Sequence, residues 1–228
     1  MKLVVNKAAV LGAGVMGAQI AAHLANANVP VVLFDLPAKE GDKNGVVKKA
    51  LDGLKRQQPS PLVTRDKLQY IDAANYEEHL ELLSGCDLII EAIAERMDWK
   101  NDLYSKIAPF LPSTAVIASN TSGLSINALA DGLPEALRPN FCGIHFFNPP
   151  RYMPLVEIIA TRSTDPATLD GLESWLTSRL GKGVVRALDT PNFVANRPGV
   201  FSTLAAMHPT PAFGLGLDTV DGLTGPKI

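Results

Sequence analysis

The most constraining feature of this sequence is a glycine-rich turn that follows the apolar run 8–11. The apolar run predicts a strand, and the small-residue segment 15–26 predicts an amphipathic helix directly after the turn. Gly12, Gly14 and Gly17 have the spacing of the dinucleotide-binding fingerprint. There the first glycine allows a sharp reversal, the second leaves room for a pyrophosphate, and the third lets helix and strand pack closely. The turn therefore predicts a dinucleotide bound at the positive end of a helix.

An acidic residue ends the second predicted strand, residues 30–35. Asp35 follows Gly17 by 18 residues, close to the spacing of about 20 at which a carboxylate binds the adenosine ribose hydroxyls. A carboxylate there would repel a 2′-phosphate, so the sequence predicts NAD rather than NADP. The alternative is a structural turn followed by a solvated aspartate.

Composition supports one substantial α/β domain. A chain of 228 residues with 46% apolar residues can bury a large core. A net charge of −2 gives no case for a nucleic-acid or membrane partner. Cys86 and Cys142 lie in apolar runs and have neither metal-ligand nor disulfide-framework spacing, so no metal site is predicted. The sequence has no recognisable signal peptide, transit peptide or 18-residue apolar run, which makes the cytoplasm the expected location.

Strand and helix patterns alternate along the rest of the chain. Strands are predicted at 70–74, 87–93, 115–119, from 141 to the region of His145, at 155–159 and at 184–188, and helices at 45–58, 76–83, 97–108 and 165–180. This alternation predicts an α/β fold with a doubly wound, mostly parallel sheet of the Rossmann type. Ligands in such sheets bind beyond the carboxyl ends of the strands, where Glu95 and the segment 119–122 fall.

The pair His145 and Glu157 is the strongest candidate for chemistry. Glu157 lies among Leu, Val and Ile in a predicted strand, where an unpaired carboxylate is costly to bury. His145, at the carboxyl end of the preceding strand, is the obvious partner. A carboxylate on one imidazole nitrogen would fix the tautomer and raise the basicity of the other nitrogen, as in a general base. The competing interpretation is a satisfied core histidine.

Five motifs, in this order, make the sequence similar to the L-3-hydroxyacyl-CoA dehydrogenases of fatty-acid β-oxidation. They are Gly12-Ala13-Gly14-Val15-Met16-Gly17, Ile90-Glu91-Ala92-Ile93-Ala94-Glu95, Ser119-Asn120-Thr121-Ser122, His145-Phe146-Phe147-Asn148-Pro149 and Asn192-Phe193-Val194-Ala195-Asn196-Arg197. The resemblance implies NAD-dependent oxidation of an L-3-hydroxyacyl-CoA to a 3-ketoacyl-CoA.

The resemblance also implies roles for individual residues. His145 would be the catalytic base, Glu157 the carboxylate that orients it, and Ser122 and Asn196 the groups that hold the substrate oxygen. The implied cofactor contacts are Gly12, Gly14, Val15, Met16, Gly17, Asp35, Glu95, Lys100 and Asn148. Without the resemblance, Ser122 and Asn196 would more simply cap helices, and Asn148 would build the turn before Pro149.

Residues 1–190 are expected to form the NAD-binding domain with its catalytic pair, and residues 191–228 a hinge and the truncated start of a helical domain. Members of the family use that domain to cover the active site and to dimerise, so the resemblance implies a homodimer or a multidomain enzyme. The chain end most resembles long bacterial forms in which an enoyl-CoA hydratase follows. This piece alone is expected to be incomplete for full activity. Pro198 and Gly199 disfavour a helix directly after Asn196.

Three questions stay open at this point. The basic residues of the helix predicted at 45–58, which are Lys48, Lys49, Lys55 and Arg56, either meet the phosphates of an acyl-CoA or form a solvated face. A different β-hydroxyacid dehydrogenase, with a lysine as its catalytic residue, is a second interpretation, against which the His145–Glu157 pair argues. A non-catalytic NAD-binding module is a third, and turnover of acetoacetyl-CoA would distinguish it from an enzyme.

Overall fold

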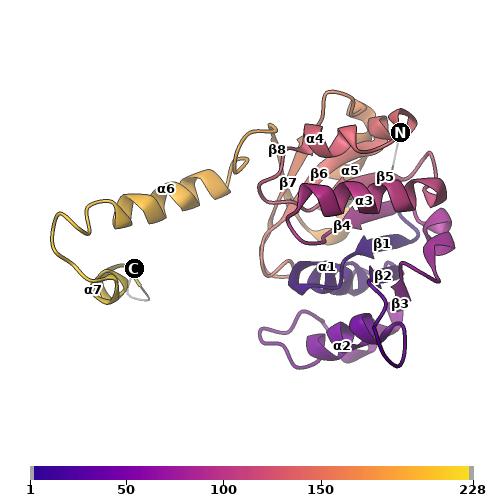
Figure 1. The fold of residues 1–228 in the computed structure, drawn as a ribbon, viewed down its shortest axis with the longest axis horizontal. Coiled ribbons are helices and arrows are strands. Elements are labelled where there is room, and N and C mark those ends of the chain that lie inside the picture. The colour runs from indigo at the N-terminus through magenta and orange to yellow at the C-terminus, as the bar shows by residue number, and fades with distance from the viewer. Residues whose placement is uncertain (1–2, 226–228) are drawn as a thin grey trace.

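The computed structural model describes residues 3–225, and its main body is one eight-stranded sheet with helices on both faces (Figure 1). The strands are β1 (Ala8–Leu11), β2 (Val31–Asp35), β3 (Ile71–Asn75), β4 (Leu88–Glu91), β5 (Val116–Ser119), β6 (Phe141–Phe146), β7 (Leu155–Ala160) and β8 (Gly183–Ala187). Their order in the sheet is β3-β2-β1-β4-β5-β6-β7-β8, and only the β6–β7 pair is antiparallel among the described strands. The predicted doubly wound, mostly parallel sheet is confirmed.

The helices follow the predicted alternation, except in the segment 76–83 and after Asn196, where Pro198 and Gly199 do not prevent a helix. They are α1 (Val15–Asn26), α2 (Gly45–Leu54), α3 (Met97–Ile107), α4 (Ile126–Asp131), α5 (Pro166–Leu180), α6 (Asn196–Met207) and α7 (Leu217–Thr224), with short 3₁₀ helices η1 (Arg65–Tyr70), η2 (Leu80–Gly85), η3 (Ala108–Phe110) and η4 (Glu135–Asn140). The helix predicted at 76–83 is wrong. The side-chain oxygen of Asn75 accepts the N–H groups of Glu77 and Glu78, which makes a turn, and η2 begins only at Leu80.

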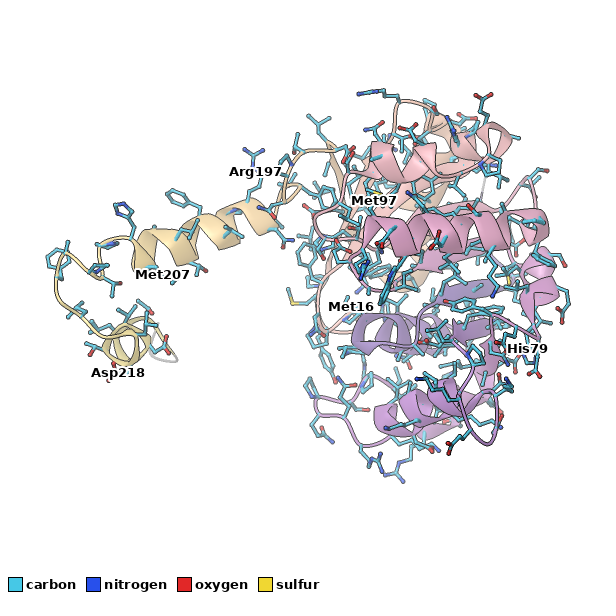
Figure 2. The ribbon with its side chains drawn as sticks, in the orientation of Figure 1. Met16, His79, Met97, Arg197, Met207 and Asp218 are labelled. Carbon is cyan, nitrogen blue, oxygen red and sulfur yellow. The ribbon has the colours of Figure 1, made fainter. Side chains whose placement is uncertain are left out.

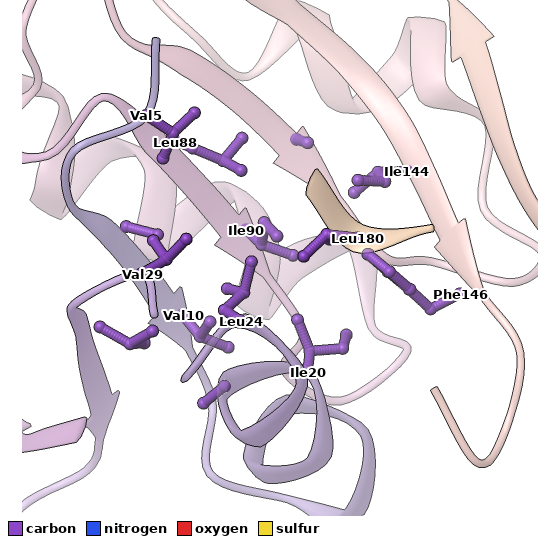
Figure 3. Packing of buried hydrophobic residues seen from close by; sticks show 14 of the residues in the cluster. Val5, Val10, Ile20, Leu24, Val29, Leu88, Ile90, Ile144, Phe146 and Leu180 are labelled. Carbon is purple, nitrogen blue, oxygen red and sulfur yellow. The ribbon is translucent and has the colours of Figure 1, made fainter. Parts of the chain in front are cut away.

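The core consists of one apolar cluster on each face of the sheet. Figure 3 shows the cluster in which Val10 and Ile90 pack against Ile20 and Leu24 of α1. The other cluster joins the remaining face to α3 and α4. Because α1, α3, α4 and α5 cover the central strands from both sides, those strands read as continuous apolar runs. Complete burial of a side chain such as that of Ile90 stabilises the fold by about 1.5–3 kcal/mol.

Helices α6 and α7 extend away from the sheet as an arm, residues 196–225 (Figure 1). Figure 2 places Arg197 near the main body and Met207 and Asp218 far from it. Helix α6 runs through Pro198 and Gly199, because Pro198 lies in the first turn, where its missing N–H costs no helical hydrogen bond. Apolar side chains of the arm are exposed, with Phe201 at 72%. Within residues 3–225, every helix is too short or too polar to cross a membrane.

Candidate active site

The glycine turn lies at the mouth of a cavity of about 500 Å³ that Gly12, Gly14 and Asp35 line together. Gly12 has a φ of +104°, and a Cβ there would lie 2.7 Å from the carbonyl oxygen of Ala92. A Cβ on Gly17 would lie 1.8 Å from the Gly12 carbonyl oxygen, so α1 packs on the turn only because this residue is glycine. A Cβ on Gly14 would meet nothing within 4 Å. Open space therefore adjoins the N-terminus of α1, as a bound pyrophosphate requires.

Asp35 is held beside this turn at the carboxyl end of β2. One carboxylate oxygen accepts the Ala13 N–H at 2.6 Å and the other accepts the Leu36 N–H at 2.7 Å. The side chain borders the same cavity as Gly14, in the position that recognition of a ribose hydroxyl needs. Val15 and Met16 form the first turn of α1, directly after Gly14, and Val15 is 67% exposed.

The carboxyl end of β4 carries a buried ion pair that the sequence reasoning missed. Glu91 is fully buried and accepts hydrogen bonds from Lys100 at 2.5 Å, Tyr104 at 3.1 Å and Ser119 at 2.6 Å. Glu91 and Ser119 are register partners on β4 and β5. In the sequence, this ion pair could have been inferred from a carboxylate at the end of an apolar strand, nine residues before a lysine. Lys100 itself is fully buried, and its contact with the cofactor stays a prediction.

Glu95 organises the turn that follows β5. Its Oε1 accepts the N–H groups of Ser122 and Gly123 at 2.9 and 3.0 Å and the Thr121 hydroxyl, and its Oε2 lies 3.7 Å from Lys100 Nζ. Partial burial on its own raises the pKa of Glu95, but these hydrogen bonds and the charge of Lys100 together hold that pKa below its usual value. The side chain is 44% exposed and borders the edge of the sheet where the glycine turn lies.

The antiparallel pairing of β6 with β7 brings His145 and Glu157 together. The two residues are direct register partners, so their side chains lie on the same face. Glu157 is fully buried, and its Oε2 lies 2.8 Å from His145 Nδ1. Its Oε1 accepts the N–H groups of Val194 and Ala195 at 2.9 and 2.8 Å, at the root of the arm. An ionised carboxylate only accepts hydrogen bonds, so Nδ1 donates to Glu157, and in a neutral imidazole with this tautomer Nε2 keeps a lone pair.

That free nitrogen points toward Ser122. The Ser122 hydroxyl lies 3.2 Å from His145 Nε2, and Ser122 is exposed. The helix that follows is capped by Ser125, whose oxygen accepts the Ala128 N–H. Ser122 is therefore not the cap of α4, and its hydroxyl faces the His145 imidazole.

Two predicted site residues remain, Asn148 and Asn196. Asn148 is exposed in the loop between β6 and β7, directly after Phe147, whose ring centroid is 4.5 Å from that of His145. Asn196 is the first residue of α6, where Ala195 is the N-cap residue, so its side chain is not the helix cap. It borders a largely apolar cavity of about 540 Å³ with Phe147, Met153 and Leu204. In the described part of the chain, its side chain makes no hydrogen bond to the His145–Glu157 pair, and its role stays a prediction.

A basic hollow lies along α2 and the residues directly after it. Lys48, Lys49, Lys55 and Arg56 border an open depression of about 460 Å³. Lys48 and Lys55 each bond to a neighbouring aspartate. Lys49 and Arg56 border the same hollow and form no ion pair among residues 3–225.

Comparison with known proteins decides the family. The sequence profile described as "3-hydroxyacyl-CoA dehydrogenase, NAD binding domain" matches residues 7–190. The chain belongs to the 3-hydroxyacyl-CoA dehydrogenase family. NAD is thus the cofactor of this domain, as the glycine turn and Asp35 predict.

Individual members of the 3-hydroxyacyl-CoA dehydrogenase family agree with this assignment. A probable 3-hydroxyacyl-CoA dehydrogenase from Deinococcus radiodurans is 43% identical over 98% of this chain and 65% of its own length. A putative fatty acid oxidation complex trifunctional enzyme from Rickettsia felis is 45% identical over 86% of this chain and 28% of its own. The crystal structure of FadB2 from M. tuberculosis superposes with a TM-score of 0.83 at 31% identity, covering 98% of this chain and 79% of that one. The chain thus spans just under two thirds of one of these curated relatives and under a third of the other.

Proposed function

We propose that this chain carries the catalytic machinery for NAD-dependent oxidation of an L-3-hydroxyacyl-CoA to a 3-ketoacyl-CoA in fatty-acid β-oxidation. The observation that supports it most strongly is the buried His145–Glu157 pair, 2.8 Å apart, whose second imidazole nitrogen faces Ser122. The pair lies at the same edge of the sheet as the glycine turn, where open α/β sheets bind their ligands. Reduction of acetoacetyl-CoA by NADH tests the proposal, and a protein that binds NADH without turnover would be a non-catalytic module.

The mechanism that we propose is a proton transfer from the substrate to His145. His145 Nε2 accepts the proton of the substrate 3-hydroxyl, while Glu157 holds Nδ1–H and stabilises the imidazolium that forms. Ser122, and Asn196 from the arm, would donate hydrogen bonds to the substrate oxygen. NAD, when bound, would supply the acceptor for the hydride that leaves the substrate carbon. The first turn of α1, Asp35, Glu95 and Asn148 are the groups that would hold it in place.

Selectivity for the cofactor is the first expected consequence. NADPH is expected to bind about 10–100-fold more weakly than NADH, because its 2′-phosphate would meet the carboxylate of Asp35 at a cost of about 1–3 kcal/mol. Fluorescence titration with both nucleotides measures the ratio. Asp35→Asn keeps an acceptor for the Ala13 N–H and is expected to bring the dissociation constants of NADPH and NADH closer together. Equal affinities in the unmodified protein would contradict the role of Asp35.

Glu157→Gln tests whether both carboxylate oxygens of Glu157 are needed. A carboxylate serves His145 with one oxygen and the N–H groups of Val194 and Ala195 with the other, whereas an amide has only one oxygen. Its NH₂ group must face either those backbone donors or His145 Nδ1, and the second choice forces the wrong tautomer on the imidazole. Turnover is expected to fall about 10–100-fold with NADH affinity retained. Unchanged steady-state rates would exclude Glu157 from the mechanism.

The hollow on α2 is proposed to receive phosphates of the CoA moiety. Lys49→Glu combined with Arg56→Glu is expected to raise KM for acetoacetyl-CoA about 3–10-fold, as exposed charges contribute up to about 1 kcal/mol each. KM for acetoacetyl-pantetheine, which lacks these phosphates, should not change. Arg162→Glu is the control, since its backbone contacts α4 rather than α2. Equal changes for both substrates would mean that the hollow is only a solvated face.

We also propose that the dehydrogenase acts as a homodimer or within a multidomain polypeptide, and that residues 191–228 begin a second, helical domain. The exposed apolar side chains of the arm, including Phe201 and Leu204, support this arrangement. So does the name of the trifunctional relative from Rickettsia felis. Without a helical domain or a partner over the active site, residues 1–228 are expected to reduce acetoacetyl-CoA slowly. A cytoplasmic location stays a prediction from the sequence.

A further inference from the structure

Lys182, between α5 and β8, has a buried side chain that none of the steps above uses. The residue is 3% exposed, and its ammonium group donates hydrogen bonds to the carbonyl oxygens of Met153, at 2.7 Å, and Pro150. Burial lowers the pKa of Lys182 to about 8, which reflects the cost of removing the ammonium from water. Such a group is retained in a protein interior only where hydrogen bonds offset that cost.

The groups near Lys182 do not neutralise its charge. His23 of α1 is buried, and burial together with the charges of Lys182 and Arg151 lowers its pKa to about 4, so it is neutral at pH 7. Arg151 is itself a cation, and its guanidinium donates to the carbonyl oxygens of Ser60 and Leu62. The two carbonyl oxygens of the β6–β7 loop are therefore the acceptors that hold the Lys182 ammonium.

Both carbonyls belong to the loop 147–154, which joins the strand of His145 to the strand of Glu157. Phe147 begins this loop and packs its ring against the His145 imidazole, at 4.5 Å between centroids. Asn148 follows it. At the other end, the Gly183 N–H donates to the Pro154 carbonyl oxygen at 2.9 Å, so the chain at Lys182 follows the loop closely. Lys182 holds the loop from the protein interior, and Arg151 holds it from the outside.

We propose that Lys182 is a positioning residue for the dehydrogenase reaction: its ammonium anchors the loop 147–154 and so keeps Phe147 in place against the His145 imidazole. This inference rests on the proposed function for its catalytic consequence, but the anchoring of the loop does not. A misplacement of about 1 Å near the reacting groups can cost about 10²-fold in rate. Of the groups proposed to hold the cofactor, only Asn148 lies in this loop, so loss of the anchor is expected to change the affinity for NADH less than it changes kcat.

Lys182→Met separates this role from a contribution to stability. Methionine fills a similar volume and removes the buried charge with its desolvation cost, but it leaves the carbonyl oxygens of Pro150 and Met153 without this donor. In the full-length protein, kcat for acetoacetyl-CoA is expected to fall about tenfold or more, with a smaller change in NADH affinity and a moderate fall in Tm. Hydrogen–deuterium exchange of the 147–154 segment is expected to accelerate about tenfold, because Tyr152 and Met153 N–H groups are protected by hydrogen bonds within this loop.

Arg186→Met is the matched control, since Arg186 lies nearby on β8 and pairs outward with Asp170 and Glu173. Its kcat and loop exchange should match those of the wild type. If Lys182→Met does not fold, Lys182→Gln, which can bond one of the two carbonyls, should show an intermediate fall in kcat. Wild-type kcat and loop exchange in a folded Met or Gln variant would overturn the proposal, and so would a lower Tm with kcat unchanged. If the wild-type protein has no turnover, the proposed function fails, and loop exchange alone decides whether Lys182 anchors the loop.

Discussion

His145→Ala is expected to lower kcat for acetoacetyl-CoA by about 10²–10⁴, the usual contribution of a general acid–base residue. NADH affinity should stay nearly unchanged, because His145 lies on β6 while the glycine turn and Asp35 end β1 and β2. The cavity left by the imidazole adjoins the rings of Phe147 and Phe193, so a moderate loss of stability should accompany the change.

The control for this variant is His79→Ala. His79 accepts the Asn75 N–H at the β3 edge of the sheet and is expected to be neutral for turnover. Stopped-flow measurement of NADH oxidation gives the rate of the chemical step for both variants. A His145→Ala protein with more than about a tenth of wild-type kcat would rule out the proton-transfer mechanism.

Gly14→Val is expected to weaken NADH binding at least about 100-fold, which corresponds to about 2.7 kcal/mol, with little change in Tm. Its backbone has a φ of −66°, which valine adopts without strain, and a Cβ there would meet nothing within 4 Å. The new side chain would instead occupy the open space over the N-terminus of α1, where the pyrophosphate is expected.

Gly17→Ala provides the contrast in the same turn. Its Cβ would lie 1.8 Å from the Gly12 carbonyl oxygen, so the helix must move away from the turn and the protein should lose stability. Calorimetric titration with NADH and thermal unfolding of the two variants separate the effects. Wild-type NADH affinity in Gly14→Val would show that the nucleotide does not approach this turn.

Local patterns in the sequence were sufficient for the fold class and for the nucleotide turn. The turn at Gly12, the bounds of α1 and the apolar strands all depend on residues close together in the chain, where periodicity and glycine spacing report directly on backbone conformation. The sequence also pointed to Glu157 and His145 as partners, because a carboxylate in an apolar strand needs one. The same local reasoning failed after β3, since the Asn75 side chain makes a turn where the sequence suggested a helix.

Contacts between distant segments were decided only by the tertiary structure. Antiparallel pairing sets the register that places Glu157 opposite His145, and the return of the chain after β8 brings the N–H groups of Val194 and Ala195 to the second carboxylate oxygen. The burial of Lys182 under the β6–β7 loop depends in the same way on where that loop lies. These contacts join residues 12 to 38 positions apart, and no periodicity encodes them. The sheet and its loops bring these donors and acceptors together at one edge. Because they are buried away from water, they form hydrogen bonds with one another.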